Sequence, residues 1–411
     1  MAAAFITGCQ TLPSQPSHPS ADQNGATHSQ SPFADQRAQP TEYVGPGREL
    51  APPASIETVA IGWFGPSDSA HPTAGLMWQA ACLAIEDANA AGGYNGAPFR
   101  LVFAWSENPW GSGIAGLARL VYDDDVWAIT GAPDGPSAHL AAQIVAKARL
   151  PFVSPVATDQ STNLAAVPWV FSCESGNHVQ VAPLASAVRD AAAVCDAANG
   201  SHVAVISCTD HDSRLLVADL LAELHGLEVH PAAHLQFQPG DRDFTAALQH
   251  LDSLEPAAVV IIAGPLDGAR FVQSLRAAGL TAPVFGGPSF ARQAFLVAAG
   301  AAAEGTVFPL SWAQSGPGAR SAEFARRFRA RFGVEPDASA ARTYDALNLL
   351  IAAIRQAGLN RALIRDAVRG MSPWNGASGS IAWDATGQNS APVGLGVVRQ
   401  GKVVPLSHDV R

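Results

Sequence analysis

Residues 126–158 read VWAITGAPDGPSAHLAAQIVAKARLPFVSPVAT, and this stretch decides the fold. A short apolar run ends in a loop of Gly, Pro and Asp, a helical pattern follows, and a second apolar run ends at Ser154. The pattern predicts a strand–loop–helix–strand unit, in which two parallel strands place their C-terminal loops at the same edge of a sheet. Ligands of open α/β sheets bind at that edge.

Two small hydroxyl side chains belong to these loops. Ser137 lies near the start of the predicted helix, and Thr158 lies just beyond the second strand. Small hydroxyls and the free N–H groups of a helix start suit a polar or anionic small molecule. The stretch is therefore typical of a binding protein.

Composition narrows the class of protein. A chain of 411 residues with 48% apolar and 15% charged residues predicts a globular protein of two domains with a tail to spare. The net charge of −10 argues against nucleic acid or an anionic membrane surface as the main partner. No apolar run reaches the length of a membrane-spanning helix.

The five cysteines show neither a CxxC motif nor a Cys/His zinc spacing, so we expect no structural metal. The pairing of Cys82, Cys173, Cys195 and Cys208 stays open from the sequence.

The N-terminus indicates export. Ile6-Thr7-Gly8-Cys9 has the form of a lipobox, which predicts a partial lipoprotein signal over 1–9 and a lipid on Cys9, although a chance cysteine is the alternative. Residues 10–55 are rich in Pro, Ser, Gln, Ala and Gly, which predicts a disordered tether with a span of ~35–40 Å. An ordinary disordered terminus has the same composition.

From Thr58 onward, strand and helix patterns alternate, and the alternation restarts at His202. Two runs of βα units predict two lobes, each with a mainly parallel sheet. A basic amphipathic helix over 321–333 and an apolar helix over 341–358 follow, before a β-rich end. We expect the four arginines of the basic helix to lie on a solvated face beside carboxylates, rather than to bind nucleic acid.

Several stretches resemble the substrate-binding proteins of branched-chain amino acid ABC importers, which are type I periplasmic binding proteins. The resemblance covers residues 58 to about 405 of the chain. The stretches that carry it are LAIEDANAAGGYNGAPFRLV at 83–102, LPFVSPVATD at 150–159, PGDRDFTAALQHL at 239–251, APVFGG at 282–287, FARRFRARFGVEPDASAARTYDALNLLIAAI at 324–354 and GSIAWDATGQN at 379–389.

The resemblance implies two doubly wound lobes, joined by a hinge of three crossings, with a ligand cleft between them. Lobe one combines 56–173 with 312–370, and lobe two combines 179–307 with 376–411. The three crossings are expected at Cys173–Val179, Val307–Trp312 and Gly370–Gly376.

The same resemblance implies ligand contacts. In amino acid-binding members, a serine and a threonine of lobe one hold the ligand carboxylate, and these map to Ser137 and Thr158. The neighbouring Ala138 and the backbone of Val156 join them, and Trp110 is expected to wall the pocket.

On lobe two, Asp212 stands where the family has a tyrosine, and the loop at Ser289 offers no carboxylate for a ligand ammonium. Asp212 and Ser289 are the ligand contacts expected from this lobe. Asp212 either replaces this counter-charge or is an ordinary loop residue.

Two other motifs indicate a cofactor or metal site only weakly. Gly111–Gly116 matches GxGxxG, but four residues separate it from the preceding strand, so the tight turn of a dinucleotide site is missing. Asp210-His211-Asp212 places an imidazole between two carboxylates, yet adjacent loop residues seldom converge on one point. We therefore expect neither a cofactor nor a metal, and no enzyme.

The predicted function is the solute-binding protein of an ABC importer. It would lie in the periplasm or cell envelope, held by a lipid anchor, and would hand a small polar ligand to a permease in the inner membrane. That ligand is expected to be amino acid-like, an amide or a carboxylate. The alternative is a ligand sensor, or a lipoprotein regulator of an envelope enzyme, on the same fold.

Overall fold

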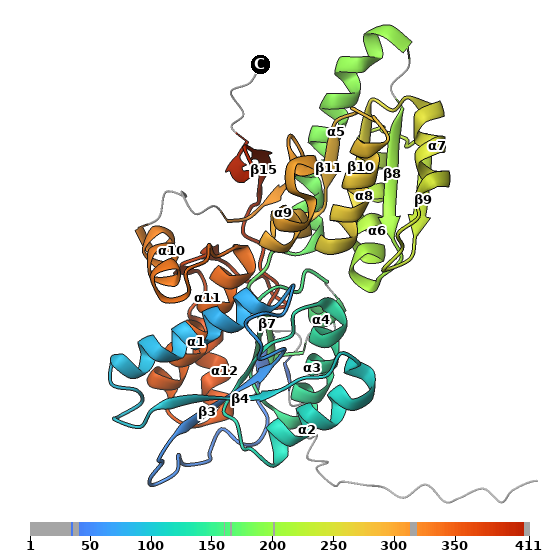
Figure 1. The fold of residues 1–411 in the computed structure, drawn as a ribbon. Helices are drawn as coiled ribbons and strands as arrows, with labels where there is room; N and C mark the ends of the chain where they lie inside the picture. Colours follow the sequence, from blue (N-terminus) through green and yellow to red (C-terminus); the bar gives the residue numbers. More distant parts are fainter. Residues whose placement is uncertain are drawn as a thin grey trace, which may run out of the picture. The chain divides into compact units, whose positions relative to one another are not determined.

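The computed structural model describes residues 34–35, 41–159, 161–164, 167–199, 202–312 and 319–406. They form two α/β lobes, each built on its own sheet (Figure 1). The predicted signal, Cys9 and most of the predicted tether lie outside the described residues.

Lobe one is built on a five-stranded sheet in the order β4-β3-β5-β6-β7, and every pairing is parallel. Its strands are β3 (Val59–Phe64), β4 (Phe99–Ala104), β5 (Ile129–Gly131), β6 (Phe152–Ser154) and β7 (Val170–Ser172). Every residue of β3 is buried, because helices cover both faces of the sheet.

One face of this sheet packs under α1 (Gly75–Ala90), α11 (Ala338–Ala357) and α12 (Arg361–Gly370), which share a core with Ile61 and Trp63 of β3. The opposite face packs under α2 (Ile114–Tyr122) and α3 (Gly135–Ala148), which share a core with Phe64. This lobe also contains η1 (Pro109–Gly113), α4 (Ser161–Leu164) and α10 (Ala319–Phe332).

Lobe two is built on a seven-stranded sheet in the order β16-β15-β12-β11-β10-β8-β9. Its strands are β8 (Val203–Cys208), β9 (Ala233–Phe237), β10 (Ala258–Ile262), β11 (Val284–Gly286), β12 (Val307–Leu310), β15 (Gly394–Arg399) and β16 (Lys402–Pro405). The first five are parallel, and the last two add to the edge at β12 as antiparallel strands.

Helices cover both faces of this second sheet as well (Figure 1). One core contains α5 (Asn177–Asn199) and α6 (His211–Gly226). The other contains α7 (Thr245–Leu254), α8 (Pro265–Ala277) and α9 (Gln293–Ala299), with the short turns η2 (Pro288–Ala291) and η3 (Gly300–Ala303). The two runs of βα units and the mainly parallel sheets confirm the predicted fold class.

The segment before β3 is more ordered than its composition predicts. β1 (Ala34–Asp35) pairs with β2 (Glu42–Tyr43), and the Tyr43 side chain, 3% exposed, lies with its ring 4.6 Å from that of Trp169. Asn360 Nδ2 donates to the carbonyl oxygens of Gly47 at 2.8 Å and Leu50 at 2.9 Å. The prediction of a disordered tether is therefore wrong for residues 41–50, because one aromatic anchor and one amide hold this segment against lobe one.

The third crossing lies later than predicted. The hairpin of β13 (Trp374–Gly376) and β14 (Gly379–Ile381) belongs to lobe one, because the Asp345 carboxylate on α11 accepts hydrogen bonds from the backbone N–H groups of Ala377 at 2.7 Å and Ser378 at 2.6 Å. Ile381 is buried in the lobe-one core. The crossing therefore lies between 389 and 394, and the predicted position at 370–376 is wrong.

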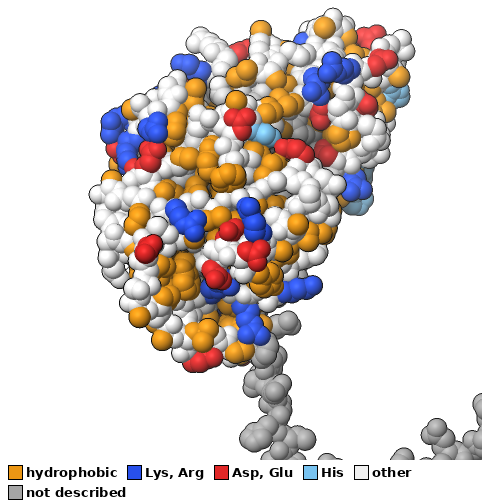
Figure 2. Space-filling model, turned by 60° about the horizontal axis from the view of Figure 1, so that its bottom comes forward, with side chains coloured by type: hydrophobic (Ala, Val, Ile, Leu, Met, Phe, Trp, Pro, Cys, Tyr) orange, Lys and Arg blue, Asp and Glu red, His pale blue; other side chains and the backbone are white. Residues whose placement is uncertain are grey.

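The basic helix has the expected partners. Figure 2 shows Lys and Arg side chains interspersed with Asp and Glu side chains on one face of the molecule. The four ion pairs of the helix are Arg326 with Glu323, Arg327 with Asp87, Arg329 with Glu335 and Arg331 with Glu86. The prediction of a solvated face beside carboxylates is confirmed.

Two general expectations bear on the described residues. Among them, no helix has the length and apolar character needed to cross a membrane. Cys82, Cys173 and Cys208 are free thiols, and Cys173 and Cys208 are buried.

Replacing Asp345 by alanine should detach the β13–β14 hairpin from α11. The change leaves the buried N–H groups of Ala377 and Ser378 without their acceptor, at a cost of ~2–4 kcal/mol in the free energy of unfolding. Urea denaturation measures this cost. Glu335→Ala removes half of an exposed ion pair and serves as the control, with an expected loss of ~0–1 kcal/mol. Equal losses for the two variants would contradict the assignment of the hairpin to lobe one.

Candidate functional site

A cavity of 320 Å³ lies between loops of the two lobes, at the carboxyl ends of their parallel strands. This volume is at the lower end of the range for small-molecule sites, ~300–1,000 Å³. Lobe one contributes Trp105 after β4, Asp134 after β5, Val156 and Thr158 after β6, and Glu174 after β7. Lobe two contributes Asp210 and Asp212 after β8, Gly264 after β10, Ser289 and Arg292 after β11, and Ser311 after β12.

The cavity brings together four of the residues expected from the sequence. Val156 and Thr158 line it from lobe one, and Asp212 and Ser289 line it from lobe two. Ser137, Ala138 and Trp110 do not line it. The pattern of strand ends is therefore a better guide to the cavity than the individual hydroxyl at Ser137.

Ser137 serves the start of α3 instead. Its side chain is fully buried, and its Oγ donates to the Asp134 carbonyl oxygen at 3.0 Å. Asp134 Oδ1 accepts from the Ser137 backbone N–H at 2.9 Å, and Ser137 Oγ accepts from the Asp134 backbone N–H at 3.4 Å, which completes a reciprocal helix cap. The spacing of an aspartate three residues before a serine is the sequence signal for this cap. Ala138 follows it, with its side chain fully buried in the lobe-one core.

Trp110 lies in η1 and is 49% exposed, with its ring 5.9 Å from that of His139. The GxGxxG stretch is split between η1 and α2, and none of its residues lines the cavity. The aromatic side chain on the cavity wall is Trp105, which directly follows β4 and which sequence reasoning missed.

Asp212, the second residue of α6, reaches from lobe two to the start of α3 in lobe one. Its Oδ2 accepts from the Gly135 backbone N–H at 3.1 Å, where the positive end of the helix dipole attracts a carboxylate. A Cβ atom at position 135 would collide with this carboxylate, so glycine permits the approach. Asp212 Oδ1 is buried and has no hydrogen-bond partner among the described residues.

Burial raises the pKa of Asp212 to about 7. The hydrogen bond from Gly135 and the nearby His211 act in the opposite direction, while the negative charges of Asp134 and Asp210 add to the increase. Asp212 is thus a carboxyl group whose ionisation is costly and depends on its immediate surroundings.

His211 makes a second contact between the lobes. Its Nε2 lies 2.9 Å from Oδ2 of Asp159, a lobe-one residue that is 4% exposed. Burial alone would raise the pKa of Asp159, but the hydrogen bonds from His211 and Ser161 outweigh burial and lower this pKa. Asp159 therefore favours its charged form beside the imidazole.

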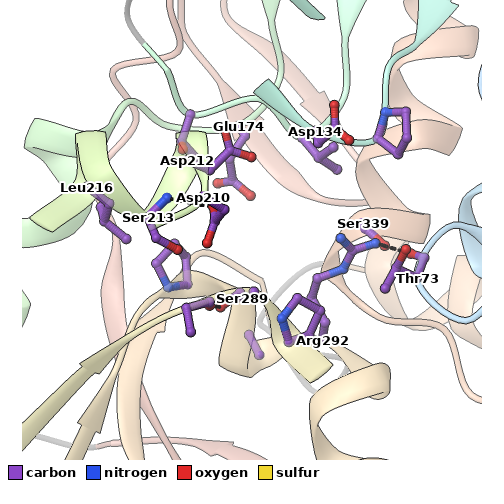
Figure 3. A pocket seen from close by; sticks show the side chains of 18 of the residues that line it. Thr73, Asp134, Glu174, Asp210, Asp212, Ser213, Leu216, Ser289, Arg292 and Ser339 are labelled. Atoms are coloured by element: carbon purple, nitrogen blue, oxygen red, sulfur yellow. Dashed lines mark hydrogen bonds between the residues drawn. The ribbon is translucent and has the colours of Figure 1, made fainter. Parts of the chain in front are cut away.

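Arg292 links the lobes at the other end of the cavity. Its Nη2 donates to the Thr73 carbonyl oxygen and to Ser339 Oγ, both in lobe one. Figure 3 shows the guanidinium pointing toward Thr73 and Ser339, on the side of the cavity away from Asp210, Asp212 and Glu174. Its Nε is buried and has no acceptor among the described residues.

Glu174 is already paired within the protein. Arg342 Nη1 lies 2.9 Å from Glu174 Oε2, and both side chains are buried. Arg342 also donates to Oγ of Ser311, the residue that follows β12. Burial raises the pKa of Glu174 and Arg342 opposes the increase. Glu174 thus lines the cavity with its charge offset by Arg342 behind it.

The Asp210-His211-Asp212 sequence does not converge on one point. Asp210 Oδ1 accepts from the Ser213 backbone N–H at 3.0 Å and caps α6, while His211 turns to Asp159 and Asp212 turns to Gly135. Within the part of the chain that the structure describes, no group of three His, Cys, Asp or Glu side chains is placed to hold a metal ion.

Replacing Asp212 by asparagine should stabilise the protein at alkaline pH. The pKa of Asp212 is raised in the folded state, so the folded protein holds its proton more tightly, and ionisation costs stability as the pH rises through about 7. Asparagine keeps an acceptor for Gly135 without the charge. We expect a gain of ~1–3 kcal/mol in the free energy of unfolding at pH 8, shrinking toward zero near pH 4.

Denaturant titrations at pH 8, 6 and 4 measure this gain. Asp252→Asn, at an exposed position on α7, is the matched control and should show no such trend. A gain for Asp212→Asn that stays constant with pH would contradict the raised pKa.

Known proteins share both sequence and fold with this chain. The model of a family described as periplasmic binding protein matches residues 58–402. An amino acid binding protein of Pseudomonas aeruginosa is 27% identical over 231 residues, which cover 56% of this chain and 60% of that protein. The match thus spans less than two thirds of that relative's length.

Solved structures extend the likeness over most of the chain. LivJ of Streptococcus pneumoniae, a branched-chain amino acid transporter substrate-binding protein in complex with isoleucine, has a TM-score of 0.76 at 21% identity, covering 85% of this chain and 100% of that chain. A leucine-binding protein LivK of Thermotoga maritima has a TM-score of 0.76 at 22% identity, covering 85% and 98%. An ABC transporter solute-binding protein of R. palustris in complex with benzoate has a TM-score of 0.73 at 19% identity, covering 85% and 95%. At these identities the likeness establishes the fold.

Proposed function

Because the model of the periplasmic binding protein family matches residues 58–402, this chain belongs to that family, and from this premise we propose that it is the solute-binding protein of an ABC importer. It captures a small polar solute in the cavity between the lobes and delivers it to a permease in the inner membrane. The observation that carries the proposal is a single cavity lined by the strand ends of two parallel sheets. The relatives named for amino acid and benzoate ligands support an amino acid-like, amide or carboxylate solute.

Ligand contacts on this proposal come from both lobes. Thr158 and the backbone of Val156 act from lobe one, and Asp212 and Ser289 act from lobe two, since all four residues line the cavity. Ser137 and Ala138 stabilise the start of α3 and do not line the cavity. Binding between the lobes draws them together, because only the closed arrangement lets one solute contact both.

The family supports a place in the periplasm or cell envelope. The lipobox at Cys9 supports a lipid anchor, and the Pro- and Ser-rich residues up to 40 would then tether the lobes to a membrane. Binding and release would involve no chemical change in the solute.

A second candidate is a ligand sensor, or a lipoprotein that regulates an envelope enzyme. It is favoured by the contacts that protein side chains themselves make between the two lobes, namely Asp212 to Gly135, His211 to Asp159 and Arg292 to Ser339. Reconstitution with the permease and ATPase separates the two candidates, because only an importer subunit stimulates solute uptake.

A thermal-shift screen of amino acids, amides and short carboxylates tests the proposed function. A solute at about 100 times its Kd stabilises the folded protein by ~2.7 kcal/mol, which raises the melting temperature clearly. A screen in which no solute stabilises the protein would count against the proposal.

For a solute found in this way, Thr158→Ala should weaken binding about tenfold in calorimetry, because one hydrogen bond to the ligand is lost. Ser253→Ala, on an exposed part of α7, removes a hydroxyl far from the lining residues and should leave the affinity unchanged. Equal affinities for Thr158→Ala and the unmodified protein would remove Thr158 from the site.

A further inference from the structure

Two adjacent residues of lobe two, His211 and Asp212, contact two different loops of lobe one. They are the first two residues of α6 and follow its cap, Asp210. Asp212 Oδ2 accepts from the backbone N–H of Gly135 at 3.1 Å, and His211 Nε2 lies 2.9 Å from Oδ2 of Asp159. A Cβ atom at position 135 would meet both side chains of α6, so the lobes approach closely here. The start of α6 therefore joins the lobes at two points.

The first of these contacts contains a carboxyl group whose proton affinity depends on the contact. Burial raises the pKa of Asp212 to about 7, and the negative charges of Asp134 and Asp210 add to the increase, while the Gly135 hydrogen bond and His211 oppose it. When the lobes separate, water reaches the carboxyl group and its pKa falls toward the ordinary value of ~3.9. The closed arrangement, with the contact formed, therefore binds a proton at Asp212 more tightly than the open one.

The second contact favours a proton in the closed arrangement as well. Burial alone would raise the pKa of Asp159, but the hydrogen bonds from His211 and Ser161 outweigh burial and lower this pKa. An imidazole changes its charge between pH 5 and 8, and its protonated form makes the stronger hydrogen bond to a carboxylate. Asp219 of α6, whose pKa burial raises, and His178 of α5, which opposes that increase, are the charged groups nearby.

The contact between the lobes at Arg292 has no such dependence. Its Nη2 donates to the Thr73 carbonyl oxygen and to Ser339 Oγ, on the side of the cavity away from Asp212 (Figure 3). A guanidinium keeps its proton at every pH at which a protein is folded. A change of pH therefore acts on the α6 side of the cavity and spares the Arg292 side.

We propose that His211 and Asp212 form a proton-dependent latch, which holds the two lobes closed at mildly acidic pH and releases them as the pH rises. The closed arrangement binds more protons at both residues, so acid favours it. The contribution of Asp212 is complete below ~4, its ordinary pKa, and is lost as the pH rises through about 7. The ratio of closed to open protein should fall about 10–100-fold between pH 5 and pH 8.

The latch is a property of the ligand-free protein, whereas its consequence for solute affinity rests on the proposed function. Small-angle X-ray scattering of the full chain without solute, at pH 5, 6.5 and 8, measures the opening of the lobes. We expect the radius of gyration to increase with pH. The double variant His211→Gln with Asp212→Asn keeps hydrogen-bonding groups that do not titrate, and its radius should stay constant.

The double variant His250→Gln with Asp252→Asn, at exposed positions on α7, is the matched control and should keep the increase. Asp159→Asn removes the charge that favours the protonated imidazole but leaves Asp212 in place, so it should reduce the increase without abolishing it. This single variant guards against misfolding of the double variant, and circular dichroism at each pH checks the helix content of both. A radius of the unmodified protein that does not increase with pH would overturn the inference, and so would an equal increase in the His211→Gln, Asp212→Asn variant.

A solute found in the thermal-shift screen, and not itself titrating between pH 6 and 8, separates this inference from the proposed function. Its affinity in calorimetry should fall about tenfold from pH 6 to pH 8, because the closed arrangement that contacts the solute from both lobes becomes less populated. The fall should be absent in the His211→Gln, Asp212→Asn variant. Equal affinities of the unmodified protein at the two pH values would overturn the inference and leave the proposed function standing. Scattering that changes with pH as expected, in a protein that binds no solute, would support the latch and count against the proposed function.

Discussion

Parallel pairing of the strands is the constraint on which the rest of this structure depends. In both sheets, the five parallel strands have the same spatial order. The second strand along the chain lies at one end of the row, the first strand lies next to it, and the third, fourth and fifth follow in turn. Parallel strands all end on one edge, so the loops that follow β4 to β7 in lobe one and β8 to β12 in lobe two gather at two edges. The cavity is formed where residues from these two sets of loops meet.

Within the cavity, the partner of each carboxylate decides its role. Glu174 faces a buried arginine and becomes part of the wall, and Asp134 and Asp210 are used as helix caps. Asp212 contacts the start of a helix in the other lobe, and one of its oxygens has no partner among the described residues. Four residues of similar chemistry thus contribute differently, since a buried charge is set by its neighbours rather than by its type.

Sequence reasoning was most reliable where local pattern is enough. The alternation of strands and helices, the strand–loop–helix–strand unit over 126–158 and the ion-paired arginine face follow from periodicity and charge, and all are present in the structure. Errors arose where one distant contact outweighs the local pattern. Tyr43 packs on Trp169 and orders a segment whose composition indicates disorder. Asp345 holds the β13–β14 hairpin in lobe one, although residues from 376 onward were expected in lobe two.

By itself, the sequence determined the fold class and the strand ends at which Val156, Thr158, Asp212 and Ser289 lie, because the period of apolar residues and the turn residues are local properties. Only the tertiary structure decided that Ser137 caps its own helix, that Arg292 crosses from one lobe to the other, and that Asp212 meets Gly135. The contacts of Arg292 and Asp212 join residues that are distant along the chain. The Ser137 hydroxyl has two acceptors on Asp134, its carbonyl and its carboxylate. Their outcome depends on which groups the folded chain brings within hydrogen-bonding distance, and no local pattern records it.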